Sequence, residues 1–134
     1  MSASEPAERE FSVLIVEDNQ NLAESLAMYL RIATGFDVHV AADGAAGVEA
    51  AKRHMPDVII CDINLPKKDG FAVAEELVQC LPRKPLLLAL TAYSGLADRL
   101  FQAGYNHYFV KPADPTEIET IISLHEHKLR SQAL

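Results

Sequence analysis

Cysteine is scarce in this chain of 134 residues, and long apolar runs are absent. The two cysteines, Cys61 and Cys80, are too few for a disulfide framework, and neither belongs to a Cys-x-x-Cys pair. No apolar run approaches the roughly eighteen residues that a membrane span needs. The N-terminal stretch lacks the positive and apolar segments of a signal peptide. We therefore expect a cytoplasmic protein that does not engage a membrane.

Basic residues are also in the minority, with twelve against nineteen acidic ones and a formal net charge of −7. Such an acidic chain has little attraction to nucleic acid or to an anionic membrane surface, so we expect neither as a partner. The 49% hydrophobic and 23% charged residues are typical of a folded domain. We expect one domain at 11–129, a short disordered N-terminal tail at 1–10 and a C-terminal tail at 130–134.

Apolar segments of strand length alternate with helical patterns along this domain. The expected strands are 11–16, 36–41, 58–61, 86–90 and 108–110. The expected helices are 19–31, 44–55, 70–80, 96–103 and a last one from Asp114-Pro115 to about Leu129. This alternation predicts an α/β fold of five strand–helix units, with a parallel sheet and helices on both faces.

Several side chains are expected to be structural rather than functional. Leu22, Leu26 and Leu30 recur every fourth residue, which predicts an amphipathic helix with these leucines in the core. Cys61 ends an apolar strand and is expected to be a small core residue rather than a reactive thiol. The five histidines fall on separate elements or, as for His125 and His127, two apart on a helix, so we expect no histidine metal site.

Polar residues follow four of the five expected strands. Glu17-Asp18 follow the first, Asp62 the third, Thr91 the fourth and Lys111 the fifth. In a parallel sheet, ligands bind at the carboxyl ends of the strands. Any one of these residues would be an ordinary loop residue, but together they place three carboxylates, a hydroxyl and an ammonium group on one rim.

Three neighbouring carboxylates repel one another and need a compensating positive charge. Because no histidine or cysteine accompanies them, their oxygen ligands suit a hard cation such as Mg²⁺ or Mn²⁺. Mg²⁺ commonly also binds phosphate oxygens, and a carboxylate is a competent nucleophile toward phosphorus. The set therefore predicts metal-assisted phosphoryl transfer onto an aspartate.

These residues stand in a pattern that resembles the receiver domain of bacterial two-component response regulators. The matching stretches are LIVED at 14–18, CDINLP at 61–66, DG at 69–70, LTA at 90–92 and YFVKP at 108–112. The resemblance covers about residues 11–129. It implies a flavodoxin-like three-layer fold with strand order 2-1-3-4-5.

The resemblance also implies roles around the acceptor. Asp62 would be the phosphoacceptor, and Asp18 and Asp62 would bind the metal directly. Glu17 would act through a water molecule, and Asn64 through its backbone carbonyl. Glu17 stands where aspartate is commoner in the family, a change expected to be tolerated at a water-mediated position.

Further roles concern the phosphoryl group and its readout. Thr91 would bind a phosphoryl oxygen, and Lys111, followed by a cis bond to Pro112, would pair with the phosphoryl group. On phosphorylation, Thr91 would move toward the new group and Tyr108 would swing inward; the alternative is that Tyr108 packs on the last helix in one rotamer. Asn64 and Tyr93 would flank the path of the hydrolytic water and modulate dephosphorylation.

The expected phosphodonor is a histidine kinase or a histidine phosphotransfer protein. The signal would be read by a partner protein or a second copy at the face formed by helix 96–103, strand 108–110 and the last helix. The segment from Thr91 to Lys111 is about two residues shorter than in many relatives, which shortens either helix 96–103 or the loop before it. The amino-acid sequence of this segment resembles that of receivers in hybrid histidine kinases. The chain is therefore either a stand-alone regulator or an excised piece of a longer protein.

Three other functions fit the sequence less well. A haloacid-dehalogenase-type phosphohydrolase needs a second aspartate two residues after its nucleophile, where this chain has Asn64. A degenerate receiver that acts only as a binding module would be expected to lack Asp62 or Lys111. Dinucleotide binding is disfavoured because 16–19 (VEDN) replaces the glycine-rich turn. We therefore expect self-phosphorylation and self-dephosphorylation, and no enzyme with an independent substrate.

Overall fold

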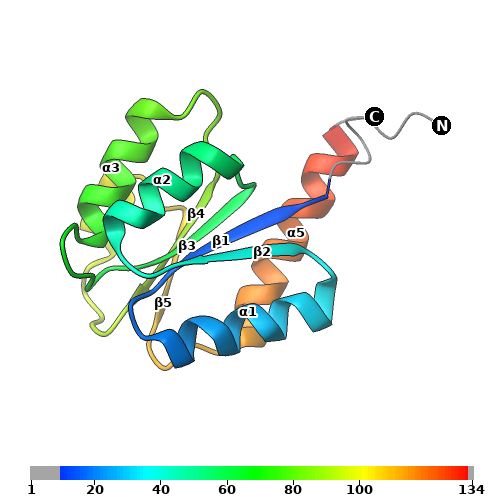
Figure 1. Ribbon diagram of the computed structural model, residues 1–134, viewed down its shortest axis with the longest axis horizontal. Coiled ribbons are helices and arrows are strands. Elements are labelled where there is room, and N and C mark those ends of the chain that lie inside the picture. The colour runs from blue at the N-terminus through cyan, green and yellow to red at the C-terminus, as the bar shows by residue number, and fades with distance from the viewer. Residues whose placement is uncertain (1–9, 133–134) are drawn as a thin grey trace.

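A five-stranded parallel sheet lies between two layers of helices in the computed structural model, which describes residues 10–132 (Figure 1). The strands are β1 (Ser12–Val16), β2 (Asp37–Ala41), β3 (Val58–Asp62), β4 (Leu86–Thr91) and β5 (His107–Val110). The helices are α1 (Gln20–Thr34), α2 (Gly44–His54), α3 (Gly70–Cys80), α4 (Ala97–Ala103) and α5 (Pro115–Gln132). The predicted flavodoxin-like architecture and the strand order 2-1-3-4-5 are confirmed.

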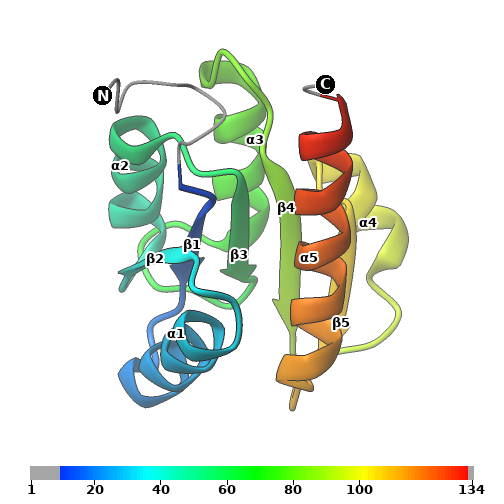
Figure 2. The same cartoon turned by 90° about the vertical axis from the view of Figure 1, so that its right-hand side faces the viewer.

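Alternating side chains of the central strands divide the core into two halves. Leu14 and Val16 face α2, α3 and α4, whereas Val13 and Ile15 face α1 and α5. Because both faces of β1 and β3 are buried, each strand carries four consecutive apolar residues, at 13–16 and 58–61, rather than an apolar residue at every second position. At one edge of the sheet, β5 lies between α4 and α5 (Figure 2).

The register of the sheet brings the ends of the strands to one level. Val16 on β1 pairs with Cys61 on β3, so Glu17 and Asp62, the next residue of each chain segment, follow at the same height. On the other side of β3, Asp62 pairs with Leu90, and Thr91 pairs with Val110. Regular parallel pairing alone therefore brings Glu17, Asp62, Thr91 and Lys111 to one rim.

The start of α3 fixes the loop that follows Asp62. Asp69 caps this helix through a bond from the Ala72 amide to Asp69 Oδ1 at 2.9 Å. A Cβ atom at Gly70 would lie 2.7 Å from the Ile63 Cα, so only glycine permits this close approach. The Tyr105 hydroxyl also donates to the Gly70 carbonyl at 2.7 Å.

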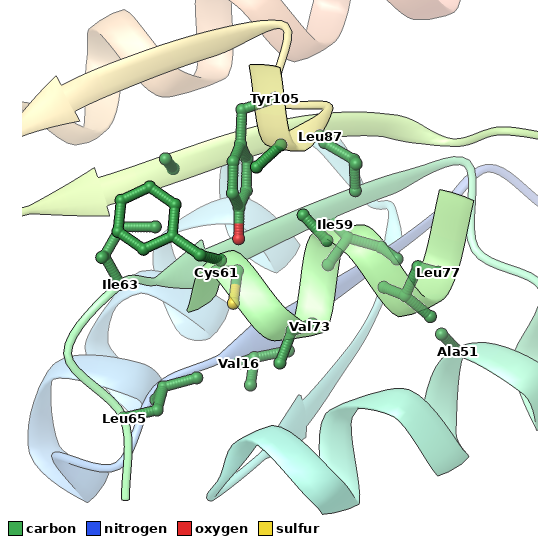
Figure 3. Packing of buried hydrophobic residues seen from close by; sticks show 14 of the residues in the cluster. Val16, Ala51, Ile59, Cys61, Ile63, Leu65, Val73, Leu77, Leu87 and Tyr105 are labelled. Carbon is green, nitrogen blue, oxygen red and sulfur yellow. The ribbon is translucent and has the colours of Figure 1, made fainter. Parts of the chain in front are cut away.

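Cys61 lies in this same packed region, next to the Tyr105 hydroxyl (Figure 3). Its side chain is fully buried, and burial raises the pKa of its thiol to about 12. The prediction that Cys61 is a core residue is confirmed. Cys80 at the end of α3 is exposed, and both thiols are free.

The prediction that Leu22, Leu26 and Leu30 all face the core is wrong. Only Leu30 is buried, Leu26 is half-buried and Leu22 is 51% exposed. Residues four apart advance by about 400° around a helix, so such a stripe drifts by about 40° at each step. The core positions of α1 are Ala23, Ala27 and Leu30, two of which are small residues that let the helix approach the sheet.

The ends of the chain differ in part from the prediction. Helix α5 continues to Gln132, so the first residues of the predicted tail at 130–134 are helical. The predicted tail at 1–10 lies, except for Glu10, outside the described residues. As expected, α4 is short, with seven residues. Within 10–132, no helix has both the length and the apolar character needed to cross a membrane.

Candidate functional site

Asp62 lies at the end of the central strand β3 with its carboxylate buried and both oxygens bonded. Its Oδ2 accepts a hydrogen bond from the Lys111 Nζ at 2.9 Å, and its Oδ1 accepts one from the backbone N–H of Asn64 at 3.1 Å. These two bonds come from different segments and fix the carboxylate at the rim of the sheet. Asn64 is thereby placed directly beside the acceptor predicted from the sequence.

Lys111 joins Asp62 to a second buried carboxylate. Its Nζ also lies 2.9 Å from Glu17 Oε1, and the other Glu17 oxygen accepts from the Asn19 amide at 3.0 Å. Asn19 in turn caps α1, so the position of Glu17 is tied to the start of that helix. The Lys111–Pro112 bond is cis, as predicted.

Burial opposes the charged form of both Glu17 and Lys111. Burial is the main cause that raises the pKa of Glu17, and the nearby Asp62 charge adds to it. Hydrogen bonds from Asn19 and Lys111 lower the pKa of Glu17, but the net shift stays upward. Burial by itself would lower the pKa of Lys111. The hydrogen bonds from Lys111 to Asp62 and Glu17 outweigh burial, so the pKa of Lys111 is raised.

Asp18 completes an acidic cluster with Glu17 and Asp62. One carboxylate oxygen of each lies within 4.8 Å of the others. Together with the Lys111 ammonium group, the three carboxylates carry a formal charge of −2, which a single divalent cation would neutralise. The donor atoms are all oxygens, so the residues fit a hard cation such as Mg²⁺.

Thr91 ends β4, and its buried hydroxyl is engaged within its own turn. Its Oγ1 accepts from the Tyr93 amide at 3.1 Å and donates to the Tyr93 carbonyl at 3.2 Å. The Tyr93 side chain itself is 63% exposed. Thr91 is therefore at the predicted rim, with a hydroxyl that must leave these contacts to reach a new anion.

Tyr108 lies on the same face of the sheet as Thr91. It pairs with Ala89, two residues before Thr91 on β4, which places both side chains on the side of α4. Its half-buried ring meets the Phe101 ring edge-on, with centroids 6.1 Å apart. The alternative in which Tyr108 packs on α5 is therefore wrong, because the ring packs toward α4.

Two cavities border this cluster, and sequence reasoning found neither. An apolar one of about 420 Å³ lies between α1 and the start of α5, and both Glu17 and Lys111 line it. Leu22 and Leu26, for which the leucine spacing predicts core positions, line it too.

The second cavity, of about 550 Å³, is more polar and lies on the side of α3 and α4. Asp18, Asn64 and Asp69 line it together with Phe71 and Arg99. No local signal marks Arg99, because only the packing of α4 beside α3 brings it near the site.

Comparison with known proteins agrees with this arrangement. Residues 13–123 match the protein family described as the response regulator receiver domain. The chain is 38% identical over 109 residues to the probable transcriptional regulatory protein TcrX of Mycobacterium tuberculosis, covering 80% of this chain and 46% of that protein. It is 37% identical over 109 residues to the transcriptional regulatory protein CreB of Escherichia coli, covering 80% of this chain and 47% of that protein. The chain thus spans about half the length of these relatives.

Solved structures give the same result. A putative response regulator from Chloroflexus aurantiacus superimposes with a TM-score of 0.78 at 32% identity, covering 87% of this chain and 98% of that one. The chemotaxis protein CheY4 of Vibrio cholerae superimposes with a TM-score of 0.77 at 26% identity, covering 86% and 98%. Because the family match extends over most of the chain and includes the acidic cluster, this chain belongs to the response regulator receiver domains of two-component systems.

Proposed function

We propose that this chain is a phosphorylation-controlled switch that accepts a phosphoryl group on Asp62. The observation that carries the proposal is the buried Asp62 carboxylate, held by Lys111 and clustered with Glu17 and Asp18. A carboxylate oxygen of Asp62 attacks phosphorus, the bond to the leaving group breaks, and that group departs with the bonding electrons. Lys111 then pairs with the new phosphoryl oxygens, and the Thr91 hydroxyl donates to one of them.

The residues that would hold Mg²⁺ or Mn²⁺ are Asp18 and Asp62 directly, Asn64 through its carbonyl and Glu17 through water. Bound there, the ion would offset negative charge on the phosphoryl oxygens. The fit rests on the close carboxylates and on their incomplete compensation by Lys111. Asn64 cannot shuttle a proton as the second aspartate of a dehalogenase-type phosphohydrolase does, so we expect no turnover of an independent substrate.

The phosphodonor would be a histidine kinase or a histidine phosphotransfer protein. The apolar cavity beside Lys111 supports a protein donor, since it offers hydrophobic surface next to the acceptor. Output would pass through the face of α4, β5 and α5, where Phe101 and Val110 are 49% and 40% exposed. A partner protein or a second copy of the chain would bind there.

Mg²⁺ should stabilise the folded protein, because it would bind the native acidic cluster and not the unfolded chain. At about a hundredfold excess over its dissociation constant, the gain is about 2–3 kcal/mol. Asp18→Asn should remove this gain in thermal unfolding measured with and without Mg²⁺. Glu24→Gln, which removes an exposed acid elsewhere on α1, should keep it. An equal gain in wild type and Asp18→Asn would contradict the assignment of Asp18.

Asp62→Asn should abolish phosphorylation, because an amide is a poor nucleophile toward phosphorus. Incubation with a small acyl phosphate and Mg²⁺, followed by mass spectrometry, should show one added phosphoryl group on wild type only. EDTA should prevent labelling of wild type as well. Asp98→Asn, at an exposed acid of α4, should label normally. Labelling of the Asp62→Asn variant that is undiminished and stable to acid would rule out Asp62 as the acceptor.

The phosphorylated state should be long-lived, since the Asn64 side chain carries no charge to activate a water molecule and the bulky Tyr93 ring screens its path. Replacing Tyr93 by alanine or glutamate should therefore hasten decay, followed by mass spectrometry after removal of the donor. Leu124→Ala, which trims another exposed apolar side chain far along α5, should leave the decay rate unchanged. If decay in the Tyr93 variants is unchanged or slower, screening by this ring is not the cause.

Phosphorylation should shift both Thr91 and Tyr108. The Thr91 hydroxyl would exchange its contacts with Tyr93 for a charge-assisted bond to the phosphoryl group. The Tyr108 ring would then move from Phe101 into the vacated space. Ring NMR spectra or structures with and without beryllofluoride, a mimic of the phosphoryl group, measure both movements. Identical positions of the two side chains in both states would show that the signal is read in another way.

A further inference from the structure

A single basic side chain, Arg99, lines the polar cavity next to the proposed acceptor. Asp18 and Asn64 line the same cavity, and the backbone N–H of Asn64 donates to the Asp62 carboxylate. Arg99 comes from α4, whereas these residues come from the loops after β1 and β3. The guanidinium group of Arg99 and the residues beside the acceptor therefore line the same cavity.

Arg99 is held in place by an aromatic ring rather than by an acid. Its Cζ lies 3.9 Å from the centroid of the Phe71 ring, a cation–π contact. Phe71 is itself buried near the start of α3, where Gly70 packs tightly against Ile63, so the ring is a firm support. Across residues 10–132, no carboxylate forms an ion pair with Arg99. Because no carboxylate of these residues engages them, the guanidinium N–H donors of Arg99 are available to an anion.

The proposed transfer from an acyl phosphate releases an anion at the site. Asp62 attacks phosphorus from the end of β3, so the bond that breaks points away from the sheet. When the donor is an acyl phosphate, the P–O bond breaks and a carboxylate departs with the electron pair. The other cavity at the site, beside Lys111, is apolar and poorly suited to a free carboxylate.

We propose that Arg99 binds the departing carboxylate of small acyl phosphate donors and thereby sets a preference for donors with an anionic leaving group. The inference rests on the proposed function, because it assigns a leaving-group subsite to the same transfer. A fork of guanidinium donors matches a carboxylate, and the bond strengthens as negative charge develops on the leaving oxygen. A donor that releases a neutral amine gains nothing from this subsite.

The test compares two donors that transfer the same phosphoryl group to Asp62. Acetyl phosphate releases acetate, whereas phosphoramidate, protonated on nitrogen, releases ammonia when its P–N bond breaks. In Arg99→Gln, the labelling rate with acetyl phosphate should fall about three- to tenfold, while the rate with phosphoramidate should change less than about twofold. Arg99→Lys should restore part of the acetyl phosphate rate, because it keeps the charge without the fork.

Two controls separate this subsite from general charge effects. Arg53→Gln removes an exposed arginine from α2 and should leave both rates unchanged. Arg99→Gln should bind beryllofluoride as tightly as wild type, because this mimic has no leaving group.

Equal losses with both donors, weakened beryllofluoride binding or an unchanged acetyl phosphate rate would each overturn the role of Arg99 while leaving Asp62 as the acceptor. Failure of wild type to label with either donor would overturn the proposed function, and this inference with it.

Discussion

The ammonium group of Lys111 is the interaction on which the rest of the site depends. It is shared between Glu17 and Asp62 at 2.9 Å each, so one cation holds together the ends of β1, β3 and β5. The Glu17 and Asp62 carboxylates are buried and have oxygens within 4.8 Å of each other, so without Lys111 both would be too costly to keep ionised. Removing one partner from such a buried pair typically costs about 3–5 kcal/mol, an upper figure here because Lys111 is 26% exposed.

The same pairing explains why the three carboxylates lie close together although Lys111 neutralises only part of their negative charge. With Asp18 added, the carboxylates outnumber the ammonium group, and the raised pKa of Glu17 reflects both burial and the Asp62 charge. A site in this condition favours a divalent cation and anionic oxygens together, since each compensates the other. Around it the surface is divided, with the apolar cavity beside Lys111 and the polar cavity beside Asn64.

Most of the fold and the rim of the site could be predicted from the sequence. Apolar segments followed by a polar residue place Glu17, Asp62, Thr91 and Lys111 at strand ends, and parallel pairing then brings such ends together. The prediction that the leucine stripe of α1 lies in the core was wrong. The spacing shows that the helix is amphipathic, but it does not show which neighbour the apolar face contacts. Leu22 lines a surface cavity near α5 instead of the core.

The sequence by itself determined the alternation of strands and helices and the identity of the chemical groups at the rim, because these are local signals. Only the tertiary structure decided how those groups meet. Glu17 and Lys111 are 94 residues apart, and their contact depends on the register of four neighbouring strands, β1, β3, β4 and β5. The contacts of Arg99 with Phe71, of Tyr108 with Phe101 and of His39 with His54 join side chains from different elements. Such contacts depend on how the elements pack, and no pattern within a single segment encodes that packing.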